Sequence, residues 1–309
     1  MLKPGFGKNL LVLAVSACSM MTSGANADSD DGLPFDEARL FFELNDTDGD
    51  LGIHGKVDGD EWKYLEIEDA RDRKMMQISV RGRLKRQGLT ELFFESAEPT
   101  FDELDPDQFF GRFPEGEYDI EGYTLGGEER ESEVYLSQVI PAAPDGVAVN
   151  GVPSADLDAC EEGLPPIIAD ATGGVTISWD PVTMSHAAKH LNDPDKIALG
   201  NDGVIDVRYY EVVVEIDESD FKSTSNIPGD QTEWQVPGSF FELAEGEDVD
   251  GEECEGGPGC FAQYKYEILV RTNVYDADGN PVLVMVDDEE DNLPGNKSAI
   301  ESCFLVPVE

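Results

Sequence analysis

The chain has 309 residues, of which 67 are aspartate or glutamate and 21 are lysine or arginine, so its formal net charge is −46. This balance argues against a nucleic-acid partner, because proteins bind phosphate backbones through basic residues. Apolar residues make up 40% of the sequence, which is enough for packed cores, and no internal apolar run is long enough to span a membrane. Length and composition therefore predict two folded domains with an acidic surface.

The first 27 residues predict export. Two lysines precede an apolar segment at residues 10–17, and the sequence Ala-Asn-Ala at 25–27 has the small-residue pattern of a signal-peptidase site. The sequence Val-Ser-Ala-Cys at 15–18 also resembles the lipobox of bacterial lipoproteins. In that case the signal ends at residue 17 and Cys18 carries the lipid. Both cleavages remain open, and contact with a membrane is expected only through this anchor.

Four of the five cysteines lie beyond the export signal, and four cysteines in an exported chain most naturally form two disulfides. Cys254 and Cys260 flank a Gly- and Pro-rich segment that can close on itself, which leaves Cys160 to pair with Cys303. A zinc site is less favoured, because the chain has no C-x-x-C pair.

Short segments with alternating apolar and polar residues run from residue 33 to residue 140. Alternation with a period of two, interrupted by Gly, Pro and Asp, predicts strands of an antiparallel β-sandwich. The clearest segments are 38–44, 65–67, 76–80, 118–120 and 134–136. The sequence at 141–160, which includes PAAPDGVAVNGVP, is rich in small residues, proline and glycine and predicts a linker.

Longer strands are predicted beyond the linker. They are 175–179, 209–216, 232–237, 264–272 and 299–306. This order, with Trp179 on an early strand and Tyr264 and Tyr266 at the start of a late one, resembles a fibronectin type III domain over about residues 161–307. The sequence thus predicts an all-β fold of two tandem antiparallel β-sandwich domains, at 33–140 and 161–309, the second of them fibronectin type III-like.

The resemblance has consequences for individual residues. It implies that Trp179 and one of Tyr264 or Tyr266 are core residues, with a tyrosine-corner role for the tyrosine. We favour Tyr266, because Ile268, Val270 and Thr272 continue its alternation. It also implies that Cys160 and Cys303 point toward opposite poles of the sandwich. A disulfide needs α-carbons within about 7 Å of each other. Pairing of Cys303 with Cys254 or Cys260 therefore stays open as well.

Three spaced aspartates, Asp46, Asp48 and Asp50, resemble the first ligands of an EF-hand calcium loop. Asp58 or Asp60 would complete the ligand set. Neither the central glycine nor the terminal glutamate of an EF-hand is in place, and the preceding residues are predicted as a strand. An Asp-Gly turn between two strands accounts for the same residues. We expect a calcium site here, with the turn as the alternative.

Catalytic motifs are scarce. His186 and His190 are four residues apart, and on a helix they would share one face and bind zinc or copper. No third ligand is identifiable, and the H-E-x-x-H motif, the nucleophile elbow, the P-loop and the dinucleotide fingerprint are all absent from the sequence. The sequence thus predicts a non-catalytic protein. The enzyme alternative is a secreted hydrolase that uses loop carboxylates or a His186/His190 metal site.

Basic residues concentrate in one short window. They are Lys56, Lys63, Arg71, Arg73, Lys74, Arg81, Arg83, Lys85 and Arg86. One interpretation is a patch for an acidic partner, such as a surface polysaccharide or a second copy of the chain. The interpretation that we favour from the sequence is that these residues pair with acidic neighbours on adjacent strands.

These features predict an exported calcium-binding adhesion or scaffold module that is periplasmic, anchored to the outer membrane or extracellular. The adhesion or spacer role follows from the fibronectin type III resemblance. Expected partners are a protein or polysaccharide at the cell surface, or another copy of the chain. A further alternative is a structural subunit of a surface layer or filament, in which the basic window of one copy meets the acidic face of the next.

Overall fold

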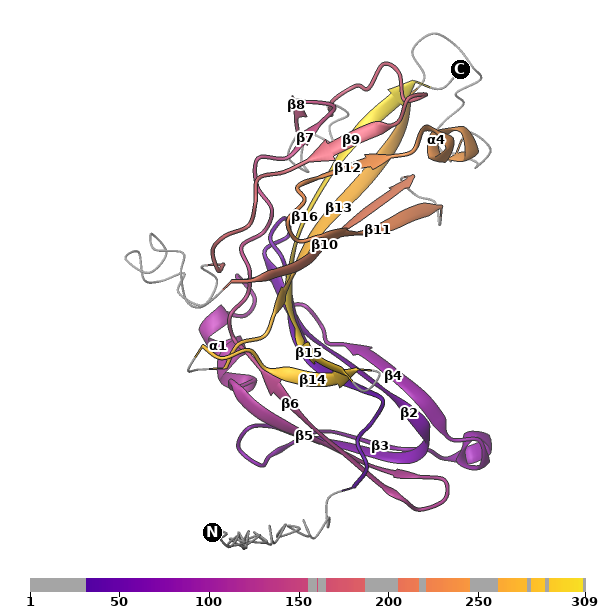
Figure 1. Ribbon diagram of the computed structural model, residues 1–309, viewed down its shortest axis with the longest axis vertical. Coiled ribbons are helices and arrows are strands. Elements are labelled where there is room, and N and C mark those ends of the chain that lie inside the picture. The colour runs from indigo at the N-terminus through magenta and orange to yellow at the C-terminus, as the bar shows by residue number, and fades with distance from the viewer. Residues whose placement is uncertain are drawn as a thin grey trace, which may run out of the picture. The chain divides into compact units, whose positions relative to one another are not determined.

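The computed structural model describes residues 32–154, 160, 165–186, 205–216, 221–244, 261–276, 279–286 and 289–307. Strands dominate this part of the chain, and its two α-helices and one 3₁₀ helix are short (Figure 1). The described strands form a ten-stranded sheet, a four-stranded sheet and a two-stranded hairpin. The predicted all-β fold class is therefore confirmed.

The strands of the first half are organised around β2, which is long enough to pair with four others. Its first half pairs with β1 on one side and β4 on the other, and its second half pairs with β5 and β3. The elements are β1 (Glu37–Asn45), β2 (Asp50–Glu68), β3 (Lys74–Ser79), η1 (Gly82–Arg86), β4 (Leu89–Glu95), α1 (Pro106–Arg112), β5 (Gly116–Thr124) and β6 (Glu129–Leu136).

The first hydrophobic core lies under these strands. Apolar residues at alternate positions of β1, including Leu40, Phe42 and Leu44, point into it, as period-two alternation requires. Phe109 and Phe110 of α1 cover one side, with their ring centroids 5.6 and 5.5 Å from that of Phe42. Edge-to-face packing of this kind adds to the stabilisation from burial.

The second half is a two-layer sandwich. One layer is β11-β10-β13-β16 of the large sheet, and the other is the sheet β12-β9-β7-β8. The elements are β7 (Ala148–Val149), β8 (Val152–Pro153), β9 (Val175–Ser178), β10 (Val207–Ile216), β11 (Lys222–Pro228), β12 (Glu233–Val236), α4 (Gly238–Ala244), β13 (Phe261–Asn273), β14 (Leu283–Val286), β15 (Glu289–Asn292) and β16 (Pro294–Pro307).

The second hydrophobic core fills the space between the two layers. Trp179 packs edge-on against Tyr210 at 5.1 Å, and both are buried together with Tyr264 and Tyr266. The Tyr266 hydroxyl bonds to the Ser154 side chain. Trp179 and Tyr266 are therefore core residues, as the sequence predicted.

Residues 141–160, predicted as a linker, contain two strands of the second layer. Asn150 and Gly151 have φ angles of +48° and +76°, and they connect β7 to β8. Two successive positive φ angles are typical of a tight hairpin turn, for which Asn-Gly is the preferred sequence. Because Val149 is fully buried in the second core, this hairpin belongs to the sandwich.

The two halves are joined through β16. β16 pairs with β13 along the sandwich and then runs parallel to β1 of the first half. Val274 and Leu293, which lie just beyond the paired parts of β13 and β16, are buried in the first core. The second half of the chain therefore completes the core of the first half, and the boundaries 33–140 and 161–309 remain predictions.

Asn296 joins three segments where β16 meets β1. Its Oδ1 atom accepts a hydrogen bond from the backbone N–H of Phe42 at 2.7 Å. Its Nδ2 atom donates to the carbonyl oxygens of Ser137 and Val139 at 2.8 and 2.6 Å. The side chain is 3% exposed, so these bonds replace water that the amide and its partners have lost.

Candidate functional site

The predicted calcium loop connects β1 to β2 as a tight turn. Asn45 organises it, because its side-chain oxygen accepts a hydrogen bond from the N–H of Thr47 at 3.0 Å and its carbonyl accepts one from Gly49 at 2.9 Å. Gly49 has a φ of +65°, which favours glycine. The turn chemistry considered as the alternative is therefore present in the structure.

Acidic side chains gather around this turn. Burial raises the pKa of Asp50 to about 6, and the negative charges of Glu98, Asp48 and Glu301 add to the increase. Burial likewise raises the pKa of Glu301. Asp46 instead pairs with His186, whose Nε2 atom lies 2.6 Å from Asp46 Oδ1. The turn thus carries more negative charge than its immediate neighbours balance.

The other two predicted ligands lie elsewhere. Asp58 is eight residues beyond Asp50 on the continuous strand β2, a distance of about 26 Å along an extended chain. Asp60 pairs with Arg130. The structure does not bring Asp58 or Asp60 to the turn, because β2 carries both residues away from it. Among the described residues, no group of three or more His, Cys, Asp or Glu side chains is arranged to hold a metal ion.

The described cysteines form one disulfide. Cys160 and Cys303 are bonded, with their α-carbons 5.9 Å apart. The opposite-poles expectation is not what this structure shows, because Cys160 follows the β7–β8 hairpin and is bonded directly to Cys303 on β16. Cys18, Cys254 and Cys260 lie outside the described residues, as does His190, so the predicted His186/His190 pair cannot be described.

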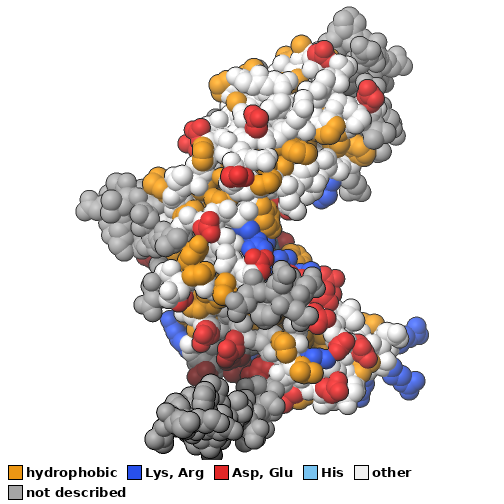
Figure 2. Space-filling model, viewed as in Figure 1, with side chains coloured by type: hydrophobic (Ala, Val, Ile, Leu, Met, Phe, Trp, Pro, Cys, Tyr) orange, Lys and Arg blue, Asp and Glu red, His pale blue; other side chains and the backbone are white. Residues whose placement is uncertain are grey.

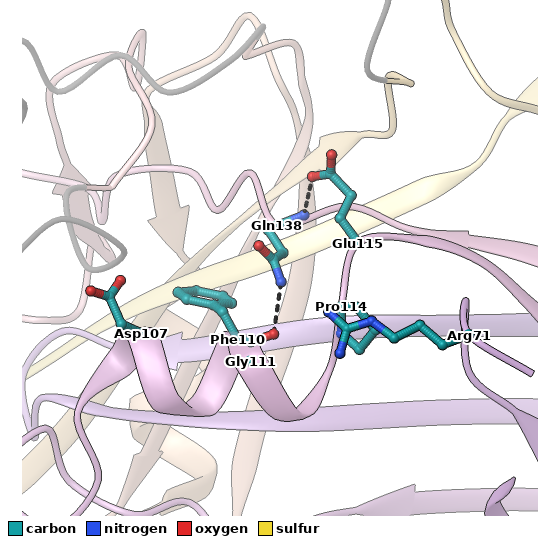
Figure 3. Close-up of a pocket in the computed structure, with 7 residues that line it drawn as sticks. All are labelled: Arg71, Asp107, Phe110, Gly111, Pro114, Glu115 and Gln138. Carbon is teal, nitrogen blue, oxygen red and sulfur yellow. Dashed lines mark hydrogen bonds between the residues drawn. The ribbon is translucent and has the colours of Figure 1, made fainter. Parts of the chain in front are cut away.

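A surface pocket of about 440 Å³ lies beside α1. Figure 3 shows Gln138 bridging it, with its Nε2 atom donating to the carbonyl of Phe110 at 3.0 Å and its backbone N–H donating to Glu115 at 2.9 Å. The remaining lining residues are Arg71, Asp107, Gly111 and Pro114. None of the seven lining residues is a histidine, cysteine, serine or lysine, and we assign the pocket no reaction.

A buried group of charged residues surrounds Phe41 where β1, β2, β13 and β16 adjoin. Phe41 is buried although it belongs to neither core. The Arg271 guanidinium lies 4.3 Å from its ring centroid, and the His54 ring stacks on it at 5.2 Å. Arg271 is 3% exposed, and its Nε and Nη2 atoms have no hydrogen-bond partner among the described residues. The cation–π contact offsets part of the cost of burying this charge.

Sequence reasoning missed this group. The only sign of this group in the sequence is that charged residues, such as Glu267 and Arg271 on β13, alternate with apolar residues along a strand. Burial raises the pKa of Glu267 to about 7, helped by the negative charges of Glu301 and Glu43. Burial also lowers the pKa of Arg271.

Glu267 should make stability depend on pH. Its pKa is higher in the folded protein than in the unfolded chain, so the stability that it contributes is complete below about pH 4.5 and is lost as the pH rises through about 7. We expect Glu267→Gln to increase the free energy of unfolding by about 2 kcal/mol at pH 8 and to change it little at pH 4. Urea unfolding at both pH values measures this. Equal effects at pH 8 from Glu267→Gln and from the exposed control Glu242→Gln would contradict it.

The basic window divides into two parts. Several residues on its strands are paired, as the sequence favoured: Lys56 with Glu37, Arg73 with Asp69, and Lys74 with Glu66. The connection between β3 and β4 is different. Arg81, Arg83, Lys85 and Arg86 there are all exposed, and none forms an ion pair with a described residue. We call these four residues the basic tip.

A surface of opposite charge lies on β2, β5 and β6. Glu121 is opposite Glu131 on β6, and Asp119 is opposite Glu68 on β2. Burial raises the pKa of Glu121, and the charges of Glu131, Glu68, Glu129 and Asp119 raise it further. We call these five carboxylates the acidic ladder. Like charges on facing strands are destabilising.

The chain has no match among protein-family models or curated proteins. Among solved structures, it is similar to the FN1–FN3 domains of chicken CNTN1, with 9% identity, 89% of this chain and 69% of that chain covered, and a TM-score of 0.27. A two-domain fibronectin type III segment of chicken tenascin gives 12% identity, coverages of 85% and 98%, and a TM-score of 0.22. The Ig1 domain of mouse SynCAM 2 gives 14% identity, with 35% of this chain and 95% of that chain covered and a TM-score of 0.19.

In the described residues, no helix has the length and apolar character needed to cross a membrane.

Proposed function

We propose that the chain is an exported, non-catalytic adhesion or scaffold module of the cell envelope or extracellular space. The observation that carries this proposal is the continuous pairing of β13 with β16 and of β16 with β1, which joins the sandwich to the strands of the first half. Strands that are hydrogen-bonded from one core into the next suit a protein that holds surfaces in place. The Cys160–Cys303 disulfide supports export, because such bonds persist in oxidising compartments.

Calcium is the cation that we propose for the turn between β1 and β2. The charges of Asp48, Glu98 and Glu301 all add to the raised pKa of Asp50 there, and carboxylate oxygens are the ligands that calcium prefers. A bound divalent cation would relieve the repulsion by which these three carboxylates add to the effect of burial on the pKa of Asp50. Asp58 and Asp60 are not part of this proposal.

The experiment is a binding assay with the labelled full chain and cell-envelope fractions of the source organism. We expect saturable binding in calcium and weaker binding in EDTA, because the cation orders the first half. Calcium at about 100 times its dissociation constant should stabilise the fold by about 2.7 kcal/mol, which raises the melting temperature by about 5–10 °C.

Asp48→Ala should show neither the calcium-dependent gain in binding nor the increase in melting temperature. The exposed control Asp107→Ala should retain both effects. If the chain binds saturably neither in calcium nor in EDTA, the adhesion role is refuted. Stoichiometric zinc in the purified protein, with hydrolase activity that a chelator removes, would support the enzyme alternative instead.

A further inference from the structure

The basic tip protrudes between β3 and β4, which both pair antiparallel with β2. Gly82 and Gly88 bracket it with φ angles of +65° and +74°, and the N–H groups of Gln87 and Gly88 both donate to the Leu84 carbonyl at 2.9 and 2.8 Å. At its base, Val80 donates to the Lys63 carbonyl at 2.9 Å. Figure 2 shows blue side chains at the right-hand edge of the view, where Figure 1 places the connection between β3 and β4.

The composition of the tip is not required by its backbone. A short connection of this kind needs glycine at its two ends, and the positions between them tolerate most residues. Apart from Gly82 and Leu84, every position from 81 to 86 holds a cation: Arg81, Arg83, Lys85 and Arg86. Leu84 stands among them, 51% exposed. Exposed cations around an exposed apolar side chain indicate a contact surface.

The acidic ladder has the complementary composition. It presents the five carboxylates across three adjoining strands, and Tyr123, which is 37% exposed, lies in the same row of β5 beyond Glu121. The Tyr123 ring is 6.0 Å from that of Tyr64 on the neighbouring strand β2. Each surface therefore combines one sign of charge with an exposed apolar group.

We infer that the basic tip of one copy of the chain docks on the acidic ladder of a second copy. This inference rests on the scaffold function proposed above and names a partner for it. Arginine and lysine side chains would pair with the carboxylates of the ladder, and Leu84 would contact Tyr123. An anionic polysaccharide or lipid surface could occupy the tip, but it would leave the ladder without a partner. Docking between copies accounts for both surfaces.

The overall charge sets the salt dependence of this contact. At a formal net charge of −46, two copies repel each other at low ionic strength, where the Debye length is long and the repulsion is little screened. The Debye length is about 10 Å at 0.1 M salt and about 3 Å at 1 M. Moderate salt screens the repulsion between whole molecules and leaves the ion pairs at the contact effective. Association should therefore be strongest near 0.15 M salt and weaker at both extremes.

Sedimentation velocity of the full chain over a range of concentrations tests the inference. We expect Arg83→Glu/Arg86→Glu to weaken association about tenfold or more, and Glu121→Lys/Glu131→Lys to do the same, because each places like charges in contact. An equimolar mixture of the two variants should associate again, since each then offers one surface complementary to the other. This recovery would not occur if either substitution only disturbed the fold.

Matched controls change the net charge equally at other exposed positions. They are Arg112→Glu/Lys222→Glu for the tip and Glu233→Lys/Glu242→Lys for the ladder, and both should associate like the parent. The parent chain remaining monomeric at all salt concentrations would overturn the inference, as would a mixture that does not recover. Binding of the tip to vesicles of phosphatidylcholine and phosphatidylserine without self-association would assign the tip to a lipid surface instead.

The envelope-binding assay separates this inference from the proposed function. If the parent binds the envelope but never self-associates, the function stands and the second copy is not its partner. If it self-associates but does not bind the envelope, the docking inference stands and the adhesion role fails.

Discussion

Removal of the Cys160–Cys303 disulfide is expected to lower the free energy of unfolding by about 5 kcal/mol. The bond joins residues that are 143 positions apart. Cross-linking so long a loop restricts the unfolded chain, and the loss of this restriction favours unfolding. Urea unfolding of Cys160→Ala/Cys303→Ala measures the effect, in a background where Cys18, Cys254 and Cys260 are alanine so that only one thiol pair is present.

Reduction provides the control for this prediction. Dithiothreitol should destabilise the background chain by a similar amount and leave the Cys160→Ala/Cys303→Ala variant unchanged. If the background and the variant unfold at the same urea concentration under oxidising conditions, the bond contributes no stability and the prediction is wrong.

Asn296→Ala is expected to lower the free energy of unfolding by about 3–5 kcal/mol. The substitution leaves three backbone groups without their partner: the Phe42 N–H and the carbonyls of Ser137 and Val139. Each is enclosed where β16 meets β1, so water does not readily replace the lost hydrogen bonds. A buried donor or acceptor that loses its partner costs about 1–3 kcal/mol.

Asn226→Ala is the matched control. Asn226 lies on the edge strand β11 and is exposed, so its truncation should change stability by no more than about 0.5 kcal/mol. Urea unfolding of both variants tests the comparison. Similar midpoints for Asn296→Ala and Asn226→Ala would show that the bonds of Asn296 contribute little.

Strands with clean alternation could be predicted from the sequence, and others could not. The segments at 38–44 and 209–216 are strands in the structure, because their apolar faces are each buried on one core. The Asp- and Gly-rich residues 50–60 look like turn sequence, yet they form the first part of β2. Pairing with β1 on one side and β4 on the other outweighs their low strand propensity. The Asn150-Gly151 hairpin was a readable turn signal inside the predicted linker.

The candidate sites were predictable only where local sequence determines them. Spaced aspartates indicated the turn at 46–50, but the pairing of Asp46 with His186 joins residues 140 positions apart and depends on the fold. The burial of Arg271 and Glu267 is also invisible in the sequence, since both occupy positions that alternation assigns to solvent. Adjacent strands enclose them only after β13, β16 and β1 come together in one sheet.

The parallel pairing of β1 with β16 has a consequence for biosynthesis. A ribosome or an export channel delivers residues 37–45 first and residues 294–307 last, yet these two segments lie side by side in the finished sheet. Until residues 294–307 arrive, β1 has an open edge, and open edges pair readily with other chains. Val274 and Leu293 are also missing from the first core until then. The time at which the first half can finish folding is thus set by the delivery of residues 294–307, long after that of β1 itself.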